Sequence, residues 1–162
     1  MNQKPSHEKK NAEALCMRLL ERKDYTKKEM KDHLFRAGCS EEEVQKAIED
    51  AEEQGYLDDC RYAENYVRTY AERRSFVRIK NDLIQRGIAK ELIEEAFSVW
   101  EEENGITKEE EEIRQIRRRI EQMDFNWDEA DWKERQKLMA SFARKGYGEE
   151  AIRRAASQKM IS

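Results

Sequence analysis

The chain has 162 residues, a net charge of −4, and charged side chains at 42% of its positions against 38% hydrophobic residues. One proline and six glycines leave few helix breakers, which favours a helical protein. No apolar run approaches the roughly 20 residues of a membrane span, and the N-terminal MNQKPSHEKK has no hydrophobic segment, so we expect a cytoplasmic protein without a secretory signal. Three scattered cysteines exclude a disulfide framework or a zinc site.

Apolar residues recur at helical spacing in nine windows, and nothing in the chain is typical of a strand. Thr26 with Glu29 and Thr107 with Glu110 predict capping boxes, and either Asp58 or Asp59 predicts a further N-cap. In chain order, the predicted helices run from Ala12 to Leu20, Thr26 to Gly38, Ser40 to Gly55, Asp58 to Tyr70, Ser75 to Gly87, Ile93 to Gly105, Thr107 to Ile120, Asp131 to Gly146 and Ala151 to Ala155.

The nine helices fall into three groups of three. When Gly38, Gly87 and Gly146 are aligned, apolar residues coincide at four offsets from the glycine. Eight residues before the glycine stand Met30, Ile79 and Leu138, and four before it stand Leu34, Leu83 and Phe142. Six residues after it stand Val44, Ile93 and Ile152, and ten after it stand Ile48, Phe97 and Ala156. The third group is longer because the segment MDFNWDEADW is inserted between its first two helices.

This register predicts an all-α, elongated array of three tandem three-helix repeats. We expect a disordered tail over residues 1–10, followed by repeats at 11–56, 57–105 and 106–162. Three short helices bury little surface alone, so we expect stacking between neighbouring repeats to supply much of the core. The expected oligomeric state is a monomer.

Charge is distributed in blocks along the chain. Residues 41–59 carry nine acids against one base, 91–112 carry ten acids against one base, and 61–90 between them carry eight bases against three acids. We interpret the acidic runs as solvated helix faces, whereas the crowded bases need an anionic partner, either nucleic-acid phosphates or an acidic protein surface. The candidate partner-binding residues of this central block are Arg61, Arg68, Arg73, Arg74, Arg78, Lys80 and Arg86.

Two further features of the basic block carry expectations. Arg74 and Arg78, four residues apart, are placed on one face of the fifth helix, and the bases of the third repeat form a weaker second contact. These third-repeat residues are Arg117, Arg118, Arg144 and Lys145. Tyr62, Tyr66 and Tyr70 share one face of the fourth helix, where they either pack on the core or offer a base-stacking platform.

No catalytic constellation is present. His7 falls in the predicted tail and His33 beside a core leucine, and neither has a Cys or Ser partner at a suggestive spacing. The glycines occur singly at helix ends, so there is no phosphate-cradling loop. Asp58 and Asp59 stand at a helix start, which favours a capping role over metal binding. We therefore expect no enzymatic activity, no metal and no cofactor.

The stretch GYLDDCRYAENYVRTY (55–70), followed by RIKNDLIQRGI (78–88), resembles the central-repeat signature of the RecX family, the bacterial regulators of the RecA recombinase. Residues 19–59 are similar to that family's first repeat, and FARKGYGEEAIRRA (142–155) matches the third more loosely, so the resemblance covers residues 12–157. One departure is Arg74-Ser75-Phe76-Val77, where many members have a glycine-containing turn.

The resemblance implies a non-enzymatic modulator that lodges in the groove of the RecA–DNA filament. It would mainly inhibit recombinase, ATPase and coprotease activities, and so regulate DNA repair and the SOS response, with DNA bound weakly or through the filament and no membrane partner. A stand-alone helical nucleic-acid-binding protein is the main alternative, because three-helix modules with basic second helices resemble helix-turn-helix units. A structural helical adaptor is a third possibility. Salt dependence of binding to naked DNA separates these functions.

Overall fold

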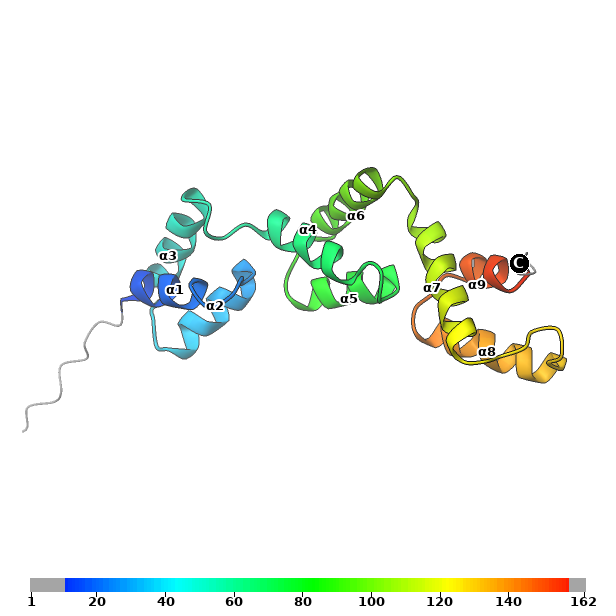
Figure 1. Ribbon diagram of the computed structural model, residues 1–162. Coiled ribbons are helices and arrows are strands. Elements are labelled where there is room, and N and C mark those ends of the chain that lie inside the picture. The colour runs from blue at the N-terminus through cyan, green and yellow to red at the C-terminus, as the bar shows by residue number, and fades with distance from the viewer. Residues whose placement is uncertain (1–10, 158–162) are drawn as a thin grey trace, which may run out of the picture.

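The computed structural model describes residues 11–157, and within that range it contains nine α-helices and no strand, as predicted (Figure 1). In chain order the helices are α1 (Ala12–Leu20), α2 (Lys27–Arg36), α3 (Glu41–Glu53), α4 (Asp59–Tyr70), α5 (Phe76–Gln85), α6 (Lys90–Asn104), α7 (Lys108–Gln122), α8 (Trp132–Arg144) and α9 (Glu149–Ser157).

The helix ends follow local capping chemistry. Both predicted capping boxes are confirmed, because Thr26 and Thr107 each accept a hydrogen bond from the backbone of a glutamate three residues later, and that glutamate bonds back to the cap. The cap of α4 is Asp58, which accepts from the backbone N–H of Arg61 at 3.1 Å. Asp59 is therefore left to bond elsewhere.

The helices form three repeats, α1–α3, α4–α6 and α7–α9, which follow one another along an elongated, arched array (Figure 1). The helices that pack most extensively belong to the same repeat, such as α4 with α6 and α7 with α9. The predicted class, an all-α array of three-helix repeats, is confirmed.

Each repeat has its own hydrophobic core. The register residues Leu34, Leu83 and Phe142 are 0, 0 and 2% exposed and lie in three separate clusters of buried side chains. Ala156, the last residue of the predicted register, is only half-buried. The expectation that stacked neighbours would share much of one core is wrong, because the buried apolar side chains form three separate clusters.

The expected disordered tail, residues 1–10 with His7, lies outside the described residues, and the repeat boundaries remain a prediction. Leu57, placed at the start of the second repeat, packs in the core cluster of the first. Among residues 11–157, no helix is long and apolar enough to cross a membrane.

Candidate functional site

The second and third repeats meet at a polar contact, here called the second joint, formed by Ser75, Phe76, Glu112, Gln115 and Lys145. The Ser75 hydroxyl donates to the carbonyl of Lys145 at 2.7 Å, and this bond places the start of α5 beside the end of α8. Gln115 on α7 donates to the carbonyl of Ala71 at 2.6 Å and accepts from the Tyr147 hydroxyl at 2.6 Å. Bases from both repeats are brought together around these bonds.

Arg119 extends this assembly, because its guanidinium donates to the carbonyl of Arg73 at 2.8 Å and lies 5.5 Å from the centroid of the Tyr147 ring. Burial raises the pKa of the Tyr147 phenol, and the nearby positive charges of Arg119 and Arg78 oppose that rise. We name as the joint patch the bases at or next to these contacts, which are Arg73, Arg78, Arg119, Lys145 and, immediately before Lys145 in the chain, Arg144.

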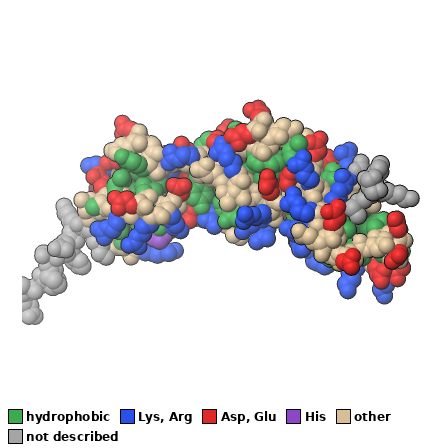
Figure 2. All heavy atoms as spheres, viewed as in Figure 1, with side chains coloured by type: hydrophobic (Ala, Val, Ile, Leu, Met, Phe, Trp, Pro, Cys, Tyr) green, Lys and Arg blue, Asp and Glu red, His purple; other side chains and the backbone are tan. Residues whose placement is uncertain are grey.

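Much of the joint patch is available to a partner. Arg73, Arg78 and Arg144 are exposed, and none of the three belongs to an ion pair found among residues 11–157. Like charges crowded in this way repel one another, so an anionic surface would stabilise the arrangement. Figure 2 shows Lys and Arg side chains along the lower edge of the view, beneath α2 and α5, and acidic side chains at the upper edge over α3 and α6.

Three of the predicted central residues are engaged within the molecule instead. Arg68 makes a bidentate pair with Glu103 at 2.6 and 3.0 Å, so hydrogen bonding raises the pKa of Arg68 and lowers that of Glu103. Lys80 pairs with Glu94 at 2.8 Å. Arg61 donates to the carbonyl of Gly55 at 2.9 Å. These contacts tie helices and turns together.

Arg74 is also engaged, and its predicted position on α5 is wrong. It precedes the N-cap Ser75 and therefore belongs to the turn before the helix. Its guanidinium lies 3.0 Å from a carboxylate oxygen of Asp82, donates to the Tyr66 hydroxyl at 3.0 Å, and stacks 3.9 Å from the centroid of the Tyr70 ring. Arg74 thus connects Tyr66 and Tyr70 of α4 with Asp82 of α5, and we call this set of contacts the bracket.

The tyrosine stripe of α4 belongs to the same bracket. Tyr62, Tyr66 and Tyr70 are half-buried and pack against the core of the second repeat. Arg86 donates to the Tyr62 hydroxyl at 2.8 Å and lies 3.8 Å from Glu29 of the first repeat. Burial is the main reason that the pKa of Tyr62 is raised. This arrangement favours the packing role of the stripe over base stacking.

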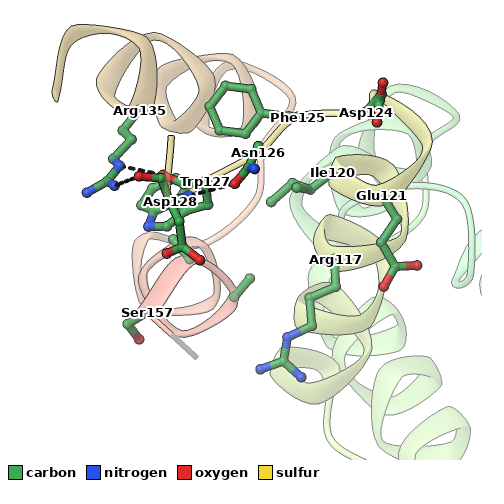
Figure 3. Close-up of a pocket in the computed structure, with 12 residues that line it drawn as sticks. Arg117, Ile120, Glu121, Asp124, Phe125, Asn126, Trp127, Asp128, Arg135 and Ser157 are labelled. Carbon is green, nitrogen blue, oxygen red and sulfur yellow. Dashed lines mark hydrogen bonds between the residues drawn. The ribbon is translucent and has the colours of Figure 1, made fainter. Parts of the chain in front are cut away.

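Arg117 and Arg118, predicted as part of the second contact, take no part in the hydrogen bonds of the second joint given above. Arg117 lines a cavity of about 710 Å³ with Ile120, Phe125 and Trp127 (Figure 3). The inserted segment after α7 forms one wall, where Arg135 donates to the carbonyl of Trp127 at 2.9 Å. Ser157, the last described residue, also lines this cavity. Arg118 is exposed, and its charge acts on the buried Glu111.

Sequence reasoning missed Arg119 as a contact residue, although a signal for it exists. Glu112, Gln115 and Arg119 follow the i, i+3, i+7 spacing, which puts them on one face of α7 next to its apolar stripe. Glu112 and Gln115 are buried, at 7 and 2% exposure, so this polar face packs against the second repeat. No group of three or more metal-ligating side chains occurs in residues 11–157.

Comparisons with known proteins place this architecture in a family. Residues 12–50 match the first three-helix domain of RecX, and residues 58–96 match the second. A "Regulatory protein RecX" from Trichlorobacter lovleyi is 30% identical over 142 residues, which is 85% of this chain and 88% of that relative. The chain belongs to the RecX family.

Two further RecX relatives are longer than this chain. A RecX from Clostridium botulinum (strain Alaska E43) is 29% identical over 90% of this chain and 66% of its own length, and one from Caldanaerobacter subterraneus is 38% identical over 67% and 54%. The chain thus spans between about half and two thirds of these two relatives. The crystal structure of RecX from Lactobacillus salivarius has the same fold, with a TM-score of 0.73, 20% identity, and coverage of 89% and 91% of the two chains.

Proposed function

We propose that this RecX-family protein binds the RecA–DNA filament and modulates, mainly by inhibition, the recombinase, ATPase and coprotease activities of RecA. The observation that carries this proposal is the composite joint patch on an elongated array of repeats in a family of regulatory proteins. An array of repeats matches a polymer of identical subunits, because each further contact forms at a high effective concentration. Exposed arginines suit carboxylate or phosphate groups on such a surface.

The test is the ATPase activity of RecA on single-stranded DNA with this protein titrated in. Inhibition should occur well below the concentration at which the protein binds the same DNA without RecA. Binding to naked DNA should be weak and should fall steeply with salt. Inhibition only at concentrations that saturate the naked DNA would instead favour a stand-alone nucleic-acid-binding protein.

The variant that locates the surface is the double reversal Arg73→Glu/Arg78→Glu, because both side chains are exposed. We expect at least about a tenfold rise in the concentration for half-inhibition, which corresponds to about 1.4 kcal/mol. The matched control is Arg18→Glu/Lys46→Glu, which changes the net charge equally at exposed positions of α1 and α3. Equal effects of the two double variants would show that net charge, not the joint patch, governs the inhibition.

A further inference from the structure

The start of α5 is capped by groups from the next repeat. The Ser75 hydroxyl accepts from the backbone of Arg78 at 3.2 Å while it donates to the carbonyl of Lys145. The backbone N–H of Phe76, which has no partner inside its own helix, donates to one oxygen of Glu112 at 3.0 Å. The other oxygen of Glu112 accepts from the backbone of Gly148 at 3.1 Å. One hydroxyl and one carboxylate therefore latch the two repeats together.

The same latch joins the first and second repeats. In this first joint, the Thr26 hydroxyl donates to the carbonyl of Arg86 at 2.6 Å, and the backbone N–H of Lys27 donates to Asp59 at 2.9 Å. Thr26 and Ser75 are 0 and 1% exposed. Both joints thus use a buried hydroxyl at the N-cap of the second helix and an acid from the first helix of the following repeat.

Two glycines make the close approach possible. Arg86 and Lys145, whose carbonyls accept the latch bonds, immediately precede Gly87 and Gly146, which have φ angles of 91° and 93°. A Cβ at Gly87 would lie 2.5 Å from Lys28, and one at Gly146 would lie 2.6 Å from the Ser75 hydroxyl. The turns that contain Gly87 and Gly146 therefore pack directly against the start of the second helix in the preceding repeat.

The third repeat has no hydroxyl at the position equivalent to Thr26 and Ser75. Thr26 and Ser75 stand twelve residues before Gly38 and Gly87, and the corresponding position before Gly146 is Glu134. Glu134 lies inside α8 and bonds to the backbone of Asp131 in a local capping box. The hydroxyl therefore occurs at the two positions where it joins repeats and is absent from the third.

We propose that Thr26, Asp59, Ser75 and Glu112 are positioning residues that fix the spacing between the basic second helices of successive repeats. The three cores are separate, so the polar contacts at the joints, with the Arg86–Glu29 pair at the first, help to hold the repeats in place. The second joint also assembles the joint patch from two repeats. In its functional part, this inference rests on the proposed binding to a filament of repeating subunits, where fixed spacing allows several contacts to form together.

Distances in the free protein test the positioning role directly. Asp32, Asn81 and Ala140 are exposed and occupy equivalent positions on α2, α5 and α8, so cysteines there can carry spin labels for pulsed electron paramagnetic resonance. The native cysteines would first be replaced by serine. We expect a narrow distance distribution between 81 and 140 that broadens in Ser75→Ala/Glu112→Gln and is retained in Ser75→Thr. Among residues 11–157 the first joint has no counterpart of the Gln115 bonds and has the longer Arg86–Glu29 pair at 3.8 Å, so we expect a broader distribution between 32 and 81.

The same variants are then compared in the RecA ATPase assay. We expect the concentration for half-inhibition to rise about tenfold in Ser75→Ala/Glu112→Gln. In the conservative variant Ser75→Thr, which keeps the hydroxyl, we expect this concentration to equal that of the wild type. Because Glu112→Gln makes the patch more positive, a purely electrostatic effect would strengthen inhibition instead. A circular-dichroism melt checks that each variant is folded, and Thr26→Val with the rescue Thr26→Ser provides a second test if the double variant unfolds.

The outcomes separate the two proposals. Unchanged distances in folded latch variants of both joints would overturn the positioning role. Broadened distances with undiminished inhibition would overturn its link to filament binding. A wild-type protein that has narrow distances but no effect on RecA would refute the proposed function and leave the latch as a structural device.

Discussion

Neighbouring residues of the basic block have different roles. Arg73 is exposed, whereas Arg74 is held by Asp82, Tyr66 and Tyr70. Sequence alone treats the two as equal members of one charge cluster, because it does not show the acid eight residues further on that folds back onto Arg74. The cations available to a partner are therefore a subset of those counted in the sequence.

This difference gives a matched pair of variants. We expect Arg74→Glu to lower the free energy of unfolding by about 1–3 kcal/mol, because a new carboxylate would face Asp82 and the half-buried Tyr66 hydroxyl would lose its donor. Arg73→Glu should change stability by less than about 0.5 kcal/mol. Urea unfolding followed by circular dichroism measures both, and equal losses would contradict the assignment of Arg74 as a bracket.

Glu111 provides a pH-dependent prediction. It is 2% exposed, one of its oxygens has no hydrogen-bond partner among the described residues, and burial raises its pKa. A raised pKa in the fold means that the contribution of Glu111 to stability is present in acid and is lost as the pH rises through that pKa. Glu111→Gln should therefore stabilise the protein at pH 7 by about 1 kcal/mol, with no gain below about pH 4. Thermal melts at both pH values measure this, with the exposed Glu102→Gln as control.

At the scale of the helices, the sequence predicts where each element begins and ends. Thr26 and Thr107 predict the two capping boxes, and Gly38, Gly87 and Gly146 predict the turns after the second helices. These predictions succeed because each signal depends on residues only a few positions away. The joints could not be predicted in this way. Thr26 is fully explained by its local cap, and nothing nearby indicates that its hydroxyl also donates to a carbonyl 60 residues further on.

The shared register predicts the cost of removing a core side chain. Leu83 on α5 is completely buried in the second cluster, so Leu83→Ala should destabilise that repeat by about 2–5 kcal/mol. Ile84→Ala, one residue away but 37% exposed, is the control and should cost much less. Chemical denaturation of both variants is the measurement, and similar costs would refute the register.

For the whole molecule, the separate cores predict that a core substitution destabilises mainly the repeat that contains it. Hydrogen exchange in Leu83→Ala should rise most across α4–α6 and much less across α1–α3, because no apolar cluster spans the two repeats. Exchange that rises equally in all nine described helices would show that the joints couple the repeats into one cooperative unit.

Separate cores also affect how the chain folds during synthesis. The first cluster is built from residues between Ala12 and Leu57, so it is complete in sequence before the second begins at Ala63. Contacts close in sequence form quickly, and nascent chains grow at about 5–20 residues per second. Each repeat can thus bury its apolar side chains while the next is still being translated. The hydrophobic surface that is exposed outside the ribosome at any time is therefore limited to that of a single repeat.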